Sequence, residues 1–365
     1  MMMYDPRRRG VRPRGRRRMH AALRAAPLLA LLAGACDLPT SMPKWDTQWQ
    51  IPVKSTTLSV GQLLPSNVTI TSDKSAFQVA VQPVTFGRSL AQMCGAACVV
   101  ATGLTVPKPA FTATFADTLR LPTDVSQATL TGGTVAIAIS NGLGFDPIRP
   151  SATARGTALL TLTSGGTTVG TLTLDGNTDA LPANTTTTRT LTLTGGAVAG
   201  RIAVSLTLNS PAGDPVRIDA NQQLNITATP QNVRLSDATV SVSQKPVSLQ
   251  PVDLNVSDID QSLVDHVKAG TLLLTINNPF GVTGTMTLHM TGPNVNISKP
   301  IQLTPGTATQ SVQFTPSEIR SILGKSGVSF TASGPLSAGT PIKVTPAQSA
   351  SINAQLQLTL GPKEG

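Results

Sequence analysis

Apolar and polar residues alternate with a period of two along most of the chain after residue 45. In the segment 201–209, every second position is apolar: Ile202, Val204, Leu206 and Leu208. The segment 351–360 repeats this alternation, and in other segments, such as 171–174 and 190–194, threonine fills the intervening positions. A side chain that is both β-branched and polar suits the solvated face of a half-buried strand. The pattern therefore predicts an all-β fold of antiparallel strands, punctuated by clusters of glycine, proline and asparagine.

Two short helices are expected to interrupt the strands. The run Thr315-Pro316-Ser317-Glu318 has the form of a capping box, with proline at the first helical position. The acidic residues within 257–260 are placed to cap a second helical turn, because carboxylates are favourable at a helix N-terminus.

Three segments recur in the same order and with similar spacing. The segment 133–141 resembles 270–278, 156–163 resembles 284–291, and 212–218 resembles 338–344. This order predicts tandem antiparallel β-sandwich domains that are two copies of one design, although a chain rich in threonine, leucine and glycine also aligns with itself by chance. The expected divisions are a signal peptide at 1–35, a lipid-anchored tether at 36–44, a small β domain at 45–124, copy 1 at 125–232, a connector at 233–259 and copy 2 at 260–365. The strands of 45–124 could instead add to the first copy.

The second copy contains a strand that runs into Asn278-Pro279-Phe280-Gly281, followed by a turn and strand over 305–314. Together these features resemble the water-stress and hypersensitive-response domain of the late-embryogenesis-abundant proteins, over residues 269–323. The resemblance implies a small β-sandwich that is non-enzymatic and associated with stress. The first copy departs from this pattern, with Asn141-Gly142 at the corresponding place.

Positive charge is concentrated at the N-terminus. The chain has a net charge of +10, and nine of its 28 Lys and Arg residues precede Cys36. The remainder of the chain is close to neutral, so we expect no nucleic-acid partner. The basic segment is followed by an apolar stretch at 25–32, which is shorter than the roughly 20 residues that span a bilayer.

Small residues at 33–35 precede Cys36, and the arrangement resembles the lipobox of bacterial lipoproteins. The resemblance implies cleavage before Cys36, a diacylglyceryl thioether on its sulfur, and acylation of the new amino group. Several acyl chains would hold the body on a membrane of the cell envelope, inner or outer. A plain secretory signal is the alternative. Translation could begin at Met19, or residues 1–18 could form a long twin-arginine-type leader.

Few residues suggest chemistry, and we predict no catalytic residue, no metal site and no cofactor. His289 lies on the threonine face of an expected strand. His266 lies near three acids, Asp258, Asp260 and Asp265. These groups could bind a cation, but their spacing lacks the glycine and the terminal glutamate of a calcium-binding loop, so a capped helix end accounts for them better.

Cys94 and Cys98 remain after Cys36 is modified. In an oxidising compartment two cysteines usually pair, and the three intervening residues do not match a Cys-x-x-Cys redox motif. We therefore predict a structural disulfide. Trp45 and Trp49 begin the expected first domain, which also contains Phe77, Phe86, Phe111 and Phe115. These aromatic residues could form a platform for a sugar or peptide, or could fill the core.

The sequence as a whole favours a non-enzymatic cell-envelope lipoprotein with a structural or protein-interaction role on a membrane surface. Its partners would be the membrane, through the anchor at Cys36, and an envelope protein or glycan. Two alternatives remain. One is a lipoprotein that binds a glycan or peptide at Trp45 and Trp49, and the other is a stress-protective β-sandwich protein.

Overall fold

The computed structural model describes residues 46–362, and the residues from Trp45 onward form one compact unit. Its strands pair in antiparallel ladders. Burial alternates along them as the sequence predicts: Ile202, Val204, Leu206 and Leu208 are buried, and the residues between them are exposed or half-buried. This periodicity confirms the predicted all-β fold, because a strand directs successive side chains to opposite faces of its sheet.

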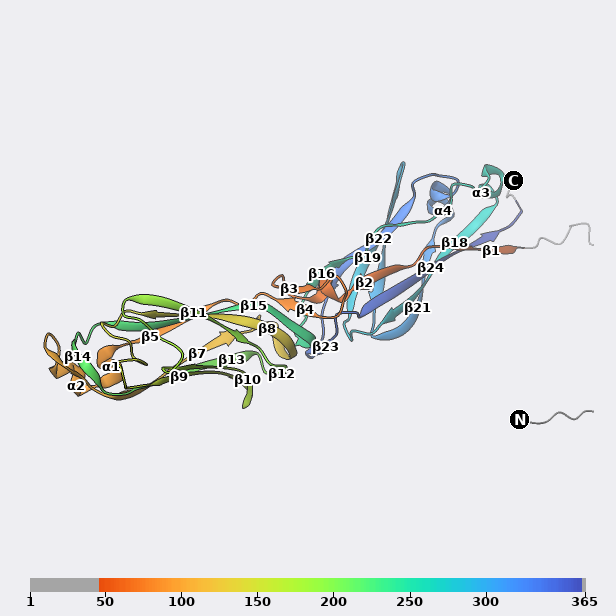
Figure 1. Cartoon of the computed structure of the whole chain (residues 1–365). Helices are drawn as coiled ribbons and strands as arrows, with labels where there is room; N and C mark the ends of the chain where they lie inside the picture. The colour runs from red at the N-terminus through yellow and green to blue at the C-terminus, as the bar shows by residue number, and fades with distance from the viewer. Residues whose placement is uncertain (1–45, 363–365) are drawn as a thin grey trace, which may run out of the picture. The chain divides into compact units, whose positions relative to one another are not determined.

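The first sandwich consists of two stacked sheets (Figure 1). The strands of one sheet, in spatial order, are β11 (Thr185–Thr192), β8 (Val125–Asn141), β15 (Gln223–Val240) and β5 (Val84–Ser89). Those of the other are β10 (Thr167–Asp175), β9 (Thr157–Ser164), β13 (Arg201–Ser210) and β7 (Phe111–Arg120). Short strands complete this part: β3 (Val68–Ile70), β4 (Phe77–Val79), β6 (Thr105–Lys108), β12 (Gly196–Val198) and β14 (Gly213–Arg217).

The second sandwich has the same plan. One sheet contains β21 (Gly306–Phe314), β18 (Val267–Asn278) and β24 (Ser349–Leu360), bordered by β1 (Thr47–Pro52) and β2 (Thr56–Ser59). The other contains β20 (Val295–Leu303), β19 (Gly284–Gly292) and β22 (Ser329–Leu336), bordered by β16 (Lys245–Ser248) and β17 (Val252–Asp253). A last short strand, β23 (Ile342–Val344), pairs with β15 of the first sandwich.

The two sandwiches agree in register as well as in strand order. Ile139 pairs with Ile226 in the first, and the corresponding Ile276 pairs with Ile352 in the second. In the other sheet, Leu160 pairs with Leu206 and the corresponding Leu288 pairs with Ala332. These pairs follow the same sequence offsets as the recurring segments. The shared register supports the prediction of two copies of one design.

A buried asparagine ends the equivalent strands β8 and β18. Asn141 donates from Nδ2 to the carbonyls of Phe145, Leu181 and Pro182, and its Oδ1 accepts the N–H of Leu143. Asn278 repeats this arrangement with the carbonyls of Val282 and Thr304 and the N–H of Phe280. Both asparagines are 1% exposed, and each satisfies backbone groups that would otherwise be buried without partners.

The domain boundaries differ from those expected. Within 45–124 only β3 and β4 pair with each other, so this segment does not form a sheet of its own. Its strands β5 and β7 border the first sandwich, as the alternative prediction allowed, whereas β1 and β2 border the second. The expected connector 233–259 contains the end of β15 and the strands β16 and β17. The difference arises because strands that are distant in the sequence pair at the borders of both sandwiches. The expected domain and connector supply such border strands.

The helices are short: η1 (Val60–Leu63), α1 (Leu90–Cys94), α2 (Ala96–Val100), α3 (Gln261–Val264) and α4 (Pro316–Ile322). The predicted capping box of α4 is confirmed, since Thr315 and Glu318 bond each other's backbone N–H. Asp260 caps α3 through the N–H of Ser262. Among residues 46–362, no helix has the length and apolar character needed to cross a membrane.

Candidate functional site

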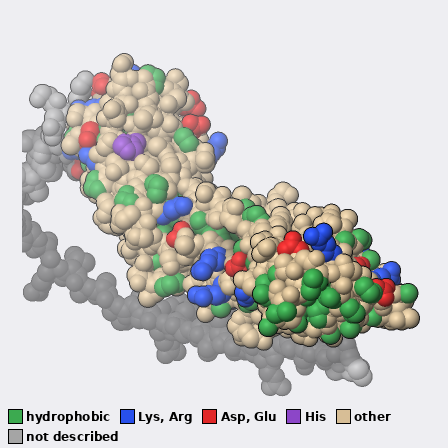
Figure 2. Space-filling view, turned by 90° about the vertical axis from the view of Figure 1, so that its left-hand side faces the viewer, with side chains coloured by type: hydrophobic (Ala, Val, Ile, Leu, Met, Phe, Trp, Pro, Cys, Tyr) green, Lys and Arg blue, Asp and Glu red, His purple; other side chains and the backbone are tan. Residues whose placement is uncertain are grey.

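The segment between β5 and β7 forms an apolar cap on the first sandwich. From Ser89 to Pro107 the chain carries no charged residue. Leu90, Met93 and Cys98 are buried and attach α1 and α2 to the core. Large aliphatic side chains nevertheless remain exposed on the cap: Val99 at 53%, Val100 at 81% and Leu104 at 55%. We call this segment, Ser89–Pro107, the cap. Figure 2 shows hydrophobic side chains gathered on this part of the surface.

Local interactions fix the shape of the cap. Ser89 and Gln92 form a capping box, in which each side chain accepts the other's backbone N–H. Gly95 separates α1 from α2 with a φ of +68°, a conformation that favours glycine. Cys94 and Cys98, for which we predicted a disulfide, are joined in the structure by an S–S bond. The exposed aliphatic residues are therefore held on a rigid turn.

A hollow of about 480 Å³ lies beside the cap. Its lining includes Gly103 from the cap, Gly144 from the loop after β8, Arg217 at the end of β14, and Asp219 and Gln222 from the segment between β14 and β15. Gln222 Oε1 accepts the N–H of Gly144, and Asp219 Oδ1 accepts the N–H of Asn221. The Arg217 side chain, in contrast, has no hydrogen-bond or ion-pair partner within residues 46–362. The hollow thus presents a guanidinium group that has no partner among the described residues, and its lining includes a residue of the cap.

A buried lysine lies at the base of the cap. Lys108 is 1% exposed, and its Nζ donates to Ser210 Oγ at 2.6 Å and to the carbonyl of Pro211. The same ammonium group lies 4.5 Å from the ring centre of Phe111 and 5.5 Å from that of Phe145. Burial lowers the pKa of Lys108 to about 8, because the charged form loses its hydration. None of the ion pairs among the described residues includes Lys108.

A serine next to a lysine of lowered pKa is the arrangement of a Ser–Lys nucleophile. Here, however, Ser210 is 0% exposed, and its Oγ donates to the carbonyl of Pro147 while accepting from Lys108. The hydroxyl proton is committed to a carbonyl, and no substrate atom can reach the oxygen. The pair instead ties three turns together at the end of the sandwich. No local pattern in the sequence indicates this pair, because the two residues are 102 positions apart.

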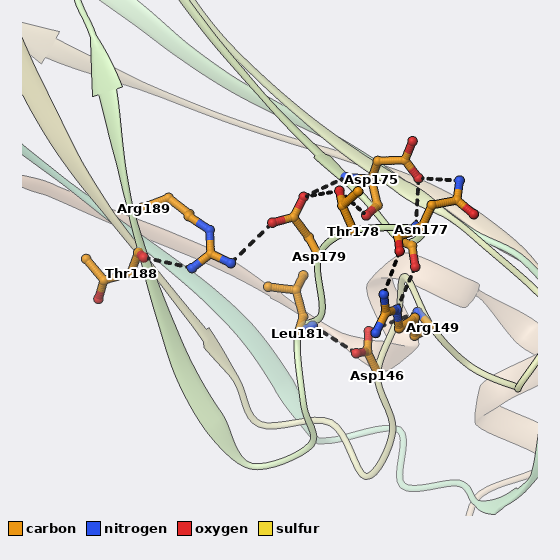
Figure 3. Close-up of polar contacts among 10 residues, drawn as sticks. Asp146, Arg149, Asp175, Asn177, Thr178, Asp179, Leu181, Thr188 and Arg189 are labelled. Atoms are coloured by element: carbon orange, nitrogen blue, oxygen red, sulfur yellow. Dashed lines mark hydrogen bonds and ion pairs between the residues drawn. The ribbon is translucent and has the colours of Figure 1, made fainter.

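A second polar cluster occupies the loops around β10 and β11 (Figure 3). Asp146 accepts the N–H groups of Ile148, Arg149 and Leu181. Arg149 donates to the carbonyls of Gly176 and Asn177, and Asp179 lies 3.2 Å from Arg189. Burial raises the pKa of Asp179, but the N–H of Asp175 and the Arg189 guanidinium outweigh it, so the pKa lies below its usual value. Asp146 therefore joins the loop after β8 to the loop after β10, and Asp179 orders its own loop and bonds Arg189 of β11.

Among the described residues, the structure places the predicted site residues on different sandwiches, with Trp49 on the second and Cys94 and Cys98 on the first. Cys36 and Trp45 lie outside the described residues. Trp49 is 41% exposed on the border strand β1, opposite Leu358. Phe77, Phe111 and Phe115 are buried in the core, which leaves Trp49 without these rings as neighbours in a platform.

The histidines have local partners. His266 Nδ1 lies 2.7 Å from the carbonyl of Ser262, and His289 Nδ1 lies 3.0 Å from Ser298 Oγ on the adjacent strand. Asp260 is occupied as the cap of α3, and Asp258 accepts from the hydroxyl of Ser257. Within residues 46–362, no group of three histidine, cysteine or acidic side chains is placed to hold a metal ion.

Comparisons with known proteins give little on function. No family model and no curated protein matches the chain. A crystal structure of a presumed secreted protein from Parabacteroides distasonis is 10% identical, with a TM-score of 0.34, and the match covers 87% of this chain and 100% of that one. The broad bean stain virus structure is 9% identical, with a TM-score of 0.22, and the match covers 82% and 93%. At these scores neither match bears on activity.

Proposed function

We propose that this chain is a non-enzymatic lipoprotein of the cell envelope that binds another envelope protein through the cap of its first sandwich. The anchor would be Cys36, on the lipobox resemblance, and the disulfide at Cys94–Cys98 accords with an oxidising compartment outside the cytoplasm. The observation that carries the proposal is the exposure of Val99, Val100 and Leu104 on a rigid segment of 19 uncharged residues. Exposed aliphatic groups that are clustered rather than scattered mark contact surfaces.

In-cell photo-crosslinking tests this role. A photoreactive phenylalanine replaces Val100 in the cap and, as a matched control, Thr307, an exposed residue of β21. The proposal expects a discrete crosslinked protein from position 100 that is absent at position 307. The substitution Leu104→Ser in the same chain should reduce that product. Identical crosslinking patterns from both positions would contradict the role of the cap.

The anchor has a separate test. Mass spectrometry of the native protein should find a mature chain that begins at a lipid-modified Cys36. An unmodified cysteine there, or a retained leader, would refute the proposed membrane anchor.

Exposed Trp49 favours the second candidate function, the binding of a glycan or peptide. The chain has only two tryptophans, so its emission reports on Trp45 and Trp49 alone. A ligand stacked on Trp49 should shift or quench this emission, and Trp49→Ala should abolish the change. A panel of glycans and peptides that leaves the emission unaltered would count against this candidate.

A further inference from the structure

The strands β14 and β23 hold equivalent places in the two sandwiches but have different partners. The segments that contain them, 212–218 and 338–344, are among those that recur in the sequence. The strand β23 pairs with the end of β15, placing Lys343 opposite Thr239. The strand β14 pairs with β6, placing Arg217 opposite Thr105. Arg217 therefore corresponds to Lys343, and β6 takes the place that β15 holds in the other pair.

Comparison with Lys343 shows that Arg217 lacks an acidic partner on the paired strand. Lys343 Nζ lies 3.5 Å from Asp237, a residue of β15 one position beyond the paired Ala238. In the β6 ladder, Ile218 donates to the carbonyl of Leu104, and Gly103 occupies the next position. Gly103 thus stands where the other pair has its aspartate. The space next to Gly103 is open, because a Cβ built on it meets no atom within 4 Å.

The hollow beside Gly103 is suited to a carboxylate. The planar guanidinium group can donate two parallel hydrogen bonds to a carboxylate, and Arg217 has no partner among the described residues. Asp219 lines the same hollow, but it is not among the ion pairs of the described residues and its Oδ1 accepts from Asn221. Leu104 follows Gly103 in the chain and Val100 precedes it by three positions, and both side chains are exposed.

We infer that the hollow binds an acidic peptide segment of a partner protein, with an Asp or Glu carboxylate on Arg217 and an aliphatic side chain on Leu104 and Val100. The inference rests on the proposed function and names the chemistry of the partner. The internal precedent is the Lys343–Asp237 pair, in which a strand supplies the carboxylate. A small free acid would leave the aliphatic residues exposed, whereas a peptide covers both parts of the surface.

A phage-displayed library of random 12-residue peptides provides the probe. The chain from residue 37 onward is immobilised, since its compact unit begins at Trp45. We expect the selected sequences to share an acidic residue next to an aliphatic one. The best peptide should bind at least about tenfold more weakly to Arg217→Gln, because a charge-assisted bond is lost. It should bind unchanged to Lys343→Gln, the matched control, and more tightly to Asp219→Asn, which removes a competing negative charge.

The outcomes separate this inference from the proposed function. Selection of no sequence, selection of sequences without an acid, or equal binding to wild type and Arg217→Gln each overturns the inference. If position 100 still crosslinks in cells after such a result, the cap remains a contact surface and only the carboxylate site is refuted. Exchange of the acid for its amide in the best peptide should have the same effect as Arg217→Gln, which excludes misfolding of the variant as the cause.

Discussion

The two sandwiches share strand order, register and a buried asparagine, yet their corresponding ends are completed differently. In the second, β23 finds its partner in β15 of the first sandwich. In the first, β14 pairs with β6, a strand supplied by the cap. Terminal caps of repeated folds normally present a polar outer surface, which keeps them soluble. This cap exposes Val99, Val100 and Leu104 instead, so closing the repeat does not explain its surface.

The buried asparagines offer the strongest test of the equivalence. Asn141 bonds four backbone groups and Asn278 bonds three. Each buried group left without a partner costs about 1–3 kcal/mol. We expect Asn141→Ala to lower the free energy of unfolding by about 4 kcal/mol and Asn278→Ala by about 3 kcal/mol, measured by urea denaturation.

The control for these two substitutions is Asn209→Ala. Asn209 is also an asparagine of the first sandwich, but its side chain is exposed. Its effect should lie within about 0.5 kcal/mol of zero. If Asn278→Ala had a small effect on the free energy of unfolding and Asn141→Ala a large one, the two asparagines would share a geometry but not a contribution to stability.

Lys108 of the first sandwich is a buried lysine outside the ion pairs of the described residues, and it should give this sandwich a distinct pH dependence. Its pKa of about 8 in the folded chain is below the ordinary 10.5, so between these values the unfolded chain binds more protons. The stability contributed by this site therefore rises as the pH increases from 8 to 10.5, by at most about 3 kcal/mol. Lys108→Met removes the titrating group, and its free energy of unfolding should lack this rise.

Urea unfolding of both chains at pH 7.5 and pH 10 measures the difference, and subtraction cancels the titration of every other group. Equal pH dependence in wild type and variant would mean that Lys108 is as well solvated in the folded chain as in the unfolded one.

Local patterns in the sequence predicted what depends on neighbouring residues. The period of two predicted the strands, and Thr315 and Glu318 predicted the N-terminal capping box of α4. The Cys94–Cys98 bond was predicted from the expected oxidising compartment, and the spacing argued only against a redox motif. The strand partners could not be predicted in this way. β1 borders the second sandwich by pairing with β24, which lies about 300 residues further along the chain. No local pattern near β1 indicates this partner.

The candidate site was missed for the same reason. The role of Arg217 follows from the registers of two ladders, one of which joins β15 to β23 over roughly 100 residues. The sequence showed the recurring segments, but only the pairing shows that Gly103 replaces Asp237. The exposure of Val99 and Val100 could not be predicted either, because aliphatic residues in sequence are expected to lie in the core.

The disulfide of the cap should contribute about 2 kcal/mol, a modest amount because it closes a short loop. Reduction should increase amide hydrogen exchange in 90–104 and leave the strands β8 and β18 protected. A Cys94→Ala, Cys98→Ala chain that begins at residue 37 has no other cysteine, so a reductant should not change its exchange. Faster exchange throughout the first sandwich would show that the cap is part of its folding unit rather than an addition to it.

The smallest expected effects compare the two capping boxes. Ser89→Ala and Thr315→Ala each remove an N-cap hydroxyl, and such a loss typically costs about 1 kcal/mol. α1 is also held by the adjacent disulfide, whereas α4 is held by its N-terminal capping box, by the Lys299–Glu318 pair at 2.8 Å and by the buried side chains of Ile319 and Ile322. Ser89→Ala should therefore cost less in the oxidised chain than in the reduced chain, and Thr315→Ala should cost the same in both. If reductant leaves the cost of Ser89→Ala unchanged, the disulfide does not hold α1 in place, and the rigidity of the cap must come from the burial of Leu90 and Met93 and from the backbone bonds of Leu90 and Ala91 to the segment before β15.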